Sequence, residues 1–197
     1  MNEATLTVER PEPQRRPKLI ADGVMGMLLF VFTEVMMFSG LISAHVIVKS
    51  QAIGQLWPPL GQPRLPFEET AINTAALLVS GLVLGFAHFA YKKRPAQALV
   101  PLAVSVLLGL FFVGFQGVEW VGLIREGLTM TSHPYGAFFY LIVGAHALHA
   151  VAAIACLGWA WNRLRRGTLN KDQFVTVQIF WYFVVLLWPF LYVQVYL

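Results

Sequence analysis

The chain has 197 residues, of which 57 % are hydrophobic and only 12 % are charged. Soluble domains carry about 25 % charged residues, so this composition excludes an ordinary soluble protein and indicates an integral membrane protein. The net charge of +4 does not indicate a nucleic-acid partner, because the basic residues form short clusters between apolar segments, as they do in membrane proteins.

Five apolar segments, each long enough to cross a bilayer as a helix, follow a polar N-terminal segment. Residues 1–20 combine three prolines with charged residues and lack an apolar core. We therefore expect a disordered cytoplasmic tail there and no signal peptide. Residues 21–197 are predicted to form one all-α membrane domain of five transmembrane helices, with spans at about 22–48, 69–91, 96–124, 133–161 and 174–196.

The loops between the predicted spans differ in charge. The tail, the turn at 92–94 and the turn at 163–171 hold eleven of the fourteen Lys and Arg residues, whereas the other loops hold Lys49, Arg64 and Arg125. By the positive-inside rule, the N-terminus lies inside and the C-terminus outside. Four prolines exclude a helix through the loop between the first two spans, and we expect Trp57 of this loop at the outer membrane interface.

Glu34 lies near the middle of the first span. An ionised carboxylate at that depth costs about 2.5–3.5 kcal/mol, so Glu34 should face protein or water rather than lipid. His45 shares this face of the helix, eleven residues further on. It lies about 16 Å along the axis, which is too far for a direct contact with Glu34.

Glu119 and Gln116 share a face of the third span, near its outer end. The carboxylate could face a proton route or a lipid headgroup, or it could be a structural acid that joins two helices. We favour the structural role, because a group near the interface costs less to bury than one at the bilayer centre.

His146 and His149 are three residues apart and project from one face of the fourth span. With Glu34 or Glu119 they could complete a metal site, but no Glu-x-x-His units face one another in this sequence. Hydrogen bonding between helices is therefore the favoured interpretation. His88 is the only histidine of the second span that could oppose them as a haem ligand, and its place beside the basic turn favours the membrane interface instead.

The last span is rich in aromatic residues, including Trp188. Aromatic side chains at helical spacing pack in cores or face lipid more often than they bind cofactors. Pro189 predicts a kink, or a free carbonyl near Val185. In the second span, Gly81 and Gly85 form a pair of small residues that permits close helix packing.

Several motifs, taken together and in order, resemble subunit III of the haem–copper oxidases. They are Thr-Glu-Val-Met-Met-Phe at 33–38, Trp-Pro-Pro at 57–59, Asn-Thr at 73–74, Ala-His at 87–88, the Gly-Leu-Phe-Phe to Glu segment at 109–119, Gly-x-His-x-x-His at 144–149 and Phe-Trp-x-Phe-Val at 180–184. The last helix departs from the family pattern, because Tyr182 and Val185 replace its usual histidine and aspartate. The chain resembles the last five helices of the seven-helix members, a short form common in bacterial oxidases.

The resemblance implies a non-catalytic subunit of a terminal oxidase in the bacterial inner membrane. Haem and copper are then expected in subunits I and II, and none in this chain. The resemblance further implies a subunit that packs on subunit I, supports proton uptake and turnover stability, binds phospholipid and is compatible with a larger respiratory assembly. The resemblance makes Glu34 the buried acid that faces subunit I. The other candidates for the lipid cleft or for subunit contacts are His88, Glu119, His146, His149, Trp57 and Trp188.

The sequence leaves two rival functions open. One is a five-helix relative associated with nitric oxide reduction. The other is a small transporter that relays a proton or metal through Glu34, His146 and His149, for which we expect internal repeats or broken helices. Pro189 is the only clear break in the helical pattern, so the transporter is the weaker hypothesis.

Overall fold

The computed structural model describes residues 21–51, 63, 65 and 67–196. Over these residues, five helices are long and apolar enough to cross a membrane, and no strand is present. The all-α prediction is confirmed. The predicted tail at 1–20 and the interfacial Trp57 lie outside the described residues. The elements in order are α1 (Asp22–Gln51), α2 (Phe67–Lys93), the 3₁₀ helix η1 (Pro95–Ala98), α3 (Leu99–Arg125), α4 (Pro134–Arg165) and α5 (Lys171–Tyr196).

The helices extend beyond most ends of the predicted spans. The 30 residues of α1 measure about 45 Å, which exceeds the roughly 30 Å of hydrocarbon that hydropathy marks. Helical hydrogen bonding continues into the interfaces, where charged side chains complement the helix dipole. α1 begins with Asp22 and ends near Lys49, and α2 begins with two acidic residues and ends with two basic ones.

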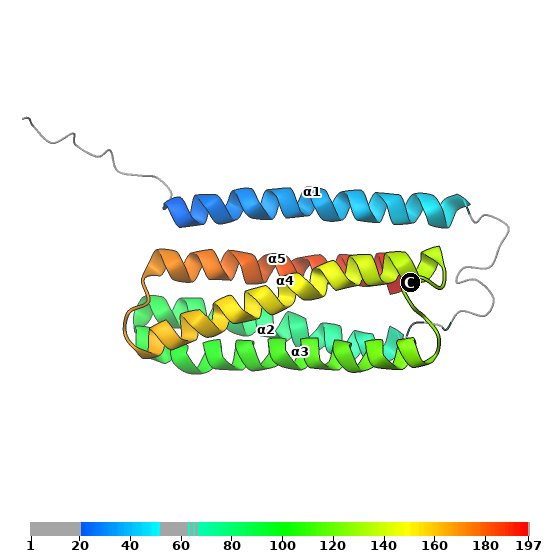
Figure 1. Cartoon of the computed structure of the whole chain (residues 1–197). Helices are drawn as coiled ribbons and strands as arrows, with labels where there is room; N and C mark the ends of the chain where they lie inside the picture. The colour runs from blue at the N-terminus through cyan, green and yellow to red at the C-terminus, as the bar shows by residue number, and fades with distance from the viewer. Residues whose placement is uncertain (1–20, 52–62, 64, 66, 197) are drawn as a thin grey trace, which may run out of the picture.

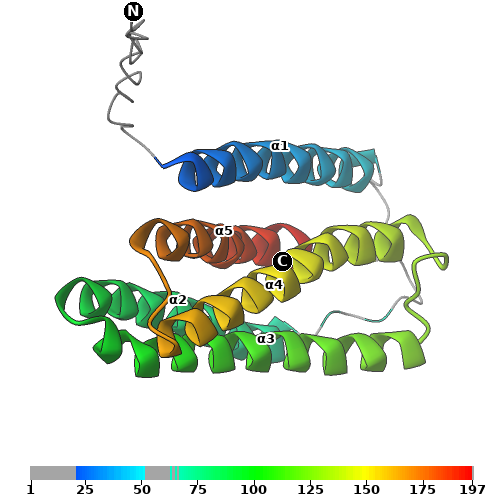
Figure 2. The ribbon, with the colours of Figure 1, turned by 60° about the vertical axis from the view of Figure 1, so that its left-hand side comes forward.

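Four of the helices form a bundle, and α1 lies along one side of it (Figures 1 and 2). α1 packs against α5 and, over a shorter length, against α4. Only 11 % of the most apolar 18-residue stretch of α1 is buried within the structure, compared with 56 % of the corresponding stretch of α5. α5 is therefore the central helix of the described chain, and most of the surface of α1 is available to lipid or to another protein.

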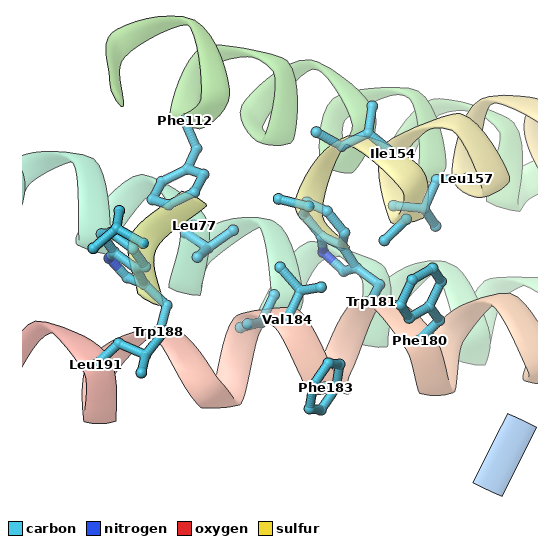
Figure 3. Close-up of a cluster of buried hydrophobic side chains, with 14 of the residues drawn as sticks. Leu77, Phe112, Ile154, Leu157, Phe180, Trp181, Phe183, Val184, Trp188 and Leu191 are labelled. Carbon is cyan, nitrogen blue, oxygen red and sulfur yellow. The ribbon is translucent and has the colours of Figure 1, made fainter. Parts of the chain in front are cut away.

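Large aromatic side chains of α5 fill the centre of the bundle (Figure 3). Trp181 and Trp188 are both fully buried, which confirms the interpretation of the aromatic residues as packing. Each indole nitrogen donates to α2: that of Trp181 to Ser80 Oγ at 3.1 Å and that of Trp188 to Thr74 Oγ1 at 2.8 Å. These bonds satisfy the only polar atom of each indole, so the rings can pack in an apolar core at little cost.

Gly109 of α3 makes the close approach of Trp181 possible. A Cβ atom at position 109 would lie 2.7 Å from Cη2 of Trp181 and 3.1 Å from a side-chain carbon of Ile154. Gly81 of α2 has a similar role, because a Cβ there would lie 3.0 Å from Cγ1 of Val185. The predicted close packing at the pair of small residues thus occurs against α5, within the chain.

The basic residues of two turns lie at one end of the bundle. The turn that follows α2 and the turn between α4 and α5 lie at the same end as the start of α1 (Figure 1). The loop between α3 and α4 lies at the opposite end, where Gly127 adopts a φ of +92°. The fold therefore separates the two sets of loops as the sequence predicts, and the orientation of the bundle in a membrane stays a prediction.

Candidate functional site: buried polar contacts between the helices

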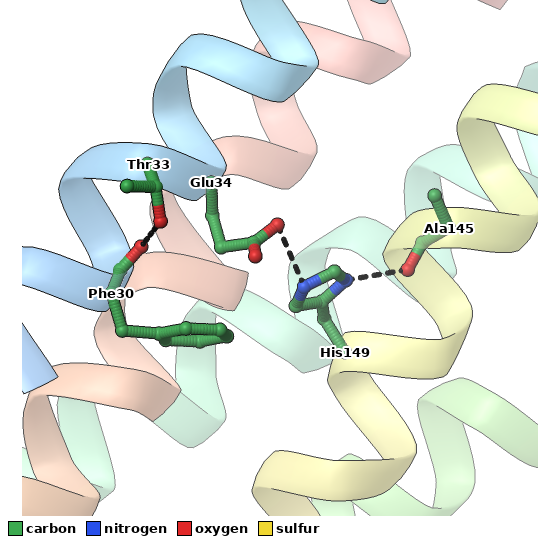
Figure 4. Close-up of polar contacts among 5 residues, drawn as sticks. All are labelled: Phe30, Thr33, Glu34, Ala145 and His149. Atoms are coloured by element: carbon green, nitrogen blue, oxygen red, sulfur yellow. Dashed lines mark hydrogen bonds and ion pairs between the residues drawn. The ribbon is translucent and has the colours of Figure 1, made fainter.

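Glu34 of α1 meets His149 of α4 inside the membrane-spanning region (Figure 4). Oε2 of Glu34 lies 3.1 Å from Nε2 of His149, and the two side chains are only 16 % and 13 % exposed. Nδ1 of the same ring lies 2.7 Å from the Ala145 carbonyl oxygen. A carbonyl oxygen can only accept, so Nδ1 carries a hydrogen and donates it.

The remaining question is where the proton between Nε2 of His149 and the carboxyl group of Glu34 lies. Nε2 and a carboxyl oxygen attract each other only if a proton lies between them, on the ring or on Glu34. In both arrangements the two side chains together have no net charge, because either both are neutral or one cation faces one anion. A pair of this kind costs much less to bury at mid-membrane depth than an isolated carboxylate does.

An apolar stripe places Glu34 against the bundle. The half-buried or buried residues of α1 recur three or four positions apart, as expected for one face of a helix. Phe38 is 1 % exposed, and its ring lies 5.6 Å from that of His149 and 6.2 Å from that of Phe183. His45 follows on this face and packs against Phe138 at 5.6 Å. This face was predicted to meet protein or water rather than lipid, and in the structure it meets protein: the partner of Glu34 within the chain is a histidine of α4. The contact of Glu34 with subunit I that the resemblance implies stays a prediction.

His146 contacts α5, whereas His149 contacts α1. It is 1 % exposed, and its Nε2 lies 3.1 Å from the Val184 carbonyl oxygen. Its ring also stacks near Trp188, with the centroids 4.8 Å apart. Pro189 lacks a backbone N–H, which removes the helical donor of the Val185 carbonyl and not that of the Val184 carbonyl. The contact of His146 therefore does not depend on the proline. The histidine pair thus joins α4 to two different helices.

Glu119 of α3 is held by donors from two helices. Thr70 of α2 lies 3.1 Å from both carboxyl oxygens, and Nε2 of Gln116 lies 2.8 Å from one of them. The same Gln116 nitrogen lies 3.1 Å from the hydroxyl oxygen of Tyr196 in α5. This arrangement supports the interpretation of Glu119 as an acid that joins helices.

His88 also makes a contact between helices. Its Nδ1 lies 2.8 Å from Oε1 of Gln178 in α5, and its ring stacks on Phe174 with the centroids 6.4 Å apart. The residue lies near the basic end of α2, as expected, but its polar contact is to α5. Among the described residues, no three His, Cys, Asp or Glu side chains come together as a metal site would require.

Comparison with known proteins gives the family of the chain. Residues 15–197 match the family model of cytochrome c oxidase subunit III. The chain is 33 % identical over 179 residues to cytochrome c oxidase subunit 3 of Danio rerio, and the match covers 87 % of this chain and 67 % of the relative. The same protein of Neurospora crassa is 31 % identical over 180 residues, with 87 % and 66 % covered. The chain belongs to the cytochrome c oxidase subunit III family.

This subunit III chain has its own contacts where it departs from the family pattern in α5. Tyr182 donates its hydroxyl hydrogen to the Gly81 carbonyl oxygen at 3.2 Å, and Val185 packs against the same glycine. A tyrosine and a valine therefore make one polar and one apolar contact to α2, in place of the contacts that a histidine and an aspartate would make.

Sequence reasoning gave no contact to several polar residues of the chain, although Asn73 belongs to one of the motifs that carry the resemblance. Asn73 donates to the Phe112 carbonyl oxygen at 3.1 Å, and Ser105 donates to the Ser80 carbonyl oxygen at 3.0 Å. Thr70 is fully buried against Glu119. Small polar residues occur often in membrane helices, so their presence alone does not identify them. Their partners depend on how the helices cross, so no signal in the sequence of one helix identifies them.

Proposed function

We propose that this chain is the non-catalytic subunit III of a respiratory haem–copper terminal oxidase. The match of residues 15–197 to the family is the observation that carries the proposal. In this role the chain packs on subunit I, stabilises the complex during turnover and supports proton uptake, while the haems and copper belong to subunits I and II. The same proposal places the chain in a bacterial inner membrane, which the resemblance to the short form of bacterial oxidases supports.

The exposed face of α1 is the surface we propose for contact with subunit I. Leu29, Phe32 and Met36 of this face are 61 %, 64 % and 61 % exposed. They lie on the side of α1 away from the stripe that packs on α5. A helix that is apolar on both sides is suited to lie between its own bundle and a second membrane protein.

Glu34 has an indirect role in this proposal. Its carboxyl group holds α1 to α4 through His149, so it fixes the position of the helix that contacts subunit I. We expect Glu34→Ala to loosen the docking of the subunit and to shorten sustained turnover of the oxidase. Normal assembly together with normal sustained turnover in this variant would contradict the role.

Phospholipid binding is a further part of the proposal. A groove of about 540 Å³ runs between α2 and α5, and apolar residues such as Leu78, Phe86 and Leu186 line it. Its apolar lining suits an acyl chain. Of the candidates for a lipid cleft, His146 and Trp188 line a different cavity, between α3 and α4. The groove therefore supports binding of lipid tails on the surface of α2 and α5.

Purification through a tag on this chain in a mild detergent tests the proposed function. We expect an optical spectrum with haem bands and two larger subunits, one of which contains haem and copper. A colourless chain that purifies alone would overturn the proposal and would favour the transporter hypothesis. Co-purification with a nitric oxide reductase would instead favour the rival membrane complex.

A further inference from the structure

Two apolar grooves flank α5. The first is the groove of about 540 Å³ between α2 and α5, which Phe86 and Leu186 help to line. The second, of about 460 Å³, lies between α1 and α5, and Val31 and Val35 line its α1 wall. Within the described part of the chain, α1 and α2 each pack on α5 but not on each other, so α5 separates the two grooves (Figure 1).

A single row of α5 side chains divides the grooves. Tyr182 and Leu186 line both of them, and Leu186 is 70 % exposed. Val185 completes the α5 wall of the α2–α5 groove, and Phe183 belongs to the α5 wall of the α1–α5 groove. Both grooves therefore follow the same turns of α5 and lie at the same depth, with the row of Tyr182 and Leu186 between them.

The apolar character of the α2–α5 groove depends on the departure from the family pattern in α5. Val185 lines this groove at the position where the pattern has an aspartate. Tyr182 stands in place of the usual histidine, and its hydroxyl group is bonded to the Gly81 carbonyl oxygen. A carboxyl group is costly to place among acyl chains, whereas a valine is compatible with them. This chain thus has an apolar wall where the pattern has a carboxyl group.

Both walls of the α2–α5 groove lead to a lysine at the basic end of the bundle. Lys93 follows the groove residue Leu82 by eleven residues, and Lys171 precedes Tyr182 by eleven. Eleven residues are three helical turns and about 20°, so each lysine lies on the groove face of its helix. Asp172 lies about 100° further around α5. Eleven residues also span about 16 Å, close to half of the roughly 30 Å hydrocarbon core.

We propose that α5 carries a site for one anionic phospholipid with two acyl chains, in the leaflet at the basic end of the bundle. One chain lies in each groove, on either side of Leu186, and the phosphate group lies near Lys93 and Lys171. The two lysines are exposed, so they are open to a headgroup at the interface. This inference rests on the proposed function, since it names the class of lipid for the groove described there and adds the second groove.

The shape of the surface favours a lipid over a helix of a partner protein. A transmembrane helix with its side chains is about 10–12 Å wide and packs best against a surface of small residues. Here Leu186 projects between the grooves, and Leu82 and Phe86 are also exposed, at 67 % and 68 %. Two thin chains that share one headgroup can follow both grooves, whereas a single helix must displace these side chains.

Tryptophan substitutions test whether one lipid occupies both grooves. Leu82→Trp adds bulk to the α2–α5 groove, and Val35→Trp adds bulk to the α1–α5 groove. Leu148→Trp is the matched control, because Leu148 is 69 % exposed on α4 and lines neither groove. We expect a cryo-electron microscopy map of the complex to show two chain densities that join near Lys93 and Lys171. Each groove variant should lose both chains, and Leu148→Trp should keep them.

Titration with defined lipids tests the charge of the headgroup. Native mass spectrometry of the complex, after its bound lipid is removed, compares dioleoyl phosphatidylglycerol with dioleoyl phosphatidylcholine. We expect tighter binding of the phosphatidylglycerol, and about thirtyfold weaker binding in the double variant Lys93→Gln, Lys171→Gln, because each basic residue near a membrane surface contributes about fivefold. The control removes two charges from the same end of the bundle, as Arg165→Gln with Arg166→Gln, and should bind as the wild type does.

The haem spectrum of the same preparations separates this inference from the proposed function. Haem bands show that the oxidase has assembled, whatever the grooves contain, and their absence refutes the proposed function instead. In an assembled complex, three results would overturn the inference. They are a helix of a partner protein in either groove, a chain that stays in one groove when the other is filled, and equal affinity for the two lipids.

Discussion

At the scale of single residues, glycine sets how closely α3 can approach the buried indole of Trp181. Gly109→Ala places a methyl group 2.7 Å from Cη2 of Trp181, so the helices must move apart. We expect a loss of about 1–3 kcal/mol in stability from overpacking. Gly114→Ala is the control, because a Cβ there has no neighbour within 4 Å and alanine favours the helix by up to about 1 kcal/mol. Thermal unfolding of the purified protein compares the two, and equal stabilities would contradict the packing argument.

The hydroxyl group of Thr70 is the donor from α2 to the carboxyl group of Glu119. Thr70→Val keeps the shape of the side chain but leaves the buried carboxyl group with one donor fewer. We expect a loss of about 1–3 kcal/mol in the free energy of unfolding. In Thr33→Val, by contrast, an exposed hydroxyl that bonds only to the Phe30 carbonyl of its own helix is removed, and stability should hardly change. Equal losses in the two variants would argue against a role of Glu119 in joining helices.

The sequence predicts which polar residues face protein, but not which partners they meet. The depth of Glu34 predicts a carboxyl group that faces protein or water rather than lipid, and the spacing of His146 and His149 places both on one face of α4. The partners depend on how the helices cross, which helical periodicity does not encode. His149 therefore meets α1, His146 meets α5, and neither contact follows from the sequence of α4 alone.

At the scale of whole helices, hydropathy predicts all five spans, and the structure adds a few residues at most of their ends. The prediction succeeds because every backbone group in a bilayer core must be hydrogen-bonded within its own segment, so long apolar segments have no alternative to the helix. The order of packing could not be predicted in the same way. Nothing in the apolar pattern of α1 indicates that it lies outside the bundle of the other four helices.

Glu34 and His149 should contribute jointly to the docking of α1. Glu34→Leu leaves Nε2 of His149 buried without a partner, and His149→Phe does the same to the carboxyl group. In the double variant neither group is left unpaired, so we expect its loss of stability to be smaller than the sum of the single losses by about 0.5–3 kcal/mol. Glu34→Gln can still donate to Nε2 and should recover part of the loss. Unfolding of the four variants in detergent measures the coupling, and strictly additive losses would show that the two groups do not interact.

At the scale of the whole molecule, the two ends of the bundle differ in charge. Lys92, Lys93 and Arg94 lie at the same end as the turn between α4 and α5, which carries further basic residues (Figure 1). The opposite end carries Arg125 and Glu126. Because basic loops are retained on the cytoplasmic side, we predict that the end with Arg94 faces the cytoplasm and that Tyr196 lies near the outer surface.

Cysteine labelling in intact cells tests this orientation. The only native cysteine, Cys156, is replaced by alanine, and single cysteines are placed at the exposed positions Glu126 and Arg166. A maleimide that cannot cross membranes should label Glu126→Cys from outside, once any outer barrier is permeable to it. Arg166→Cys should react only after the membrane is opened, and the variant without cysteine gives the background. Labelling of Arg166→Cys in intact membranes would invert the topology and would place Glu119 near the cytoplasmic surface.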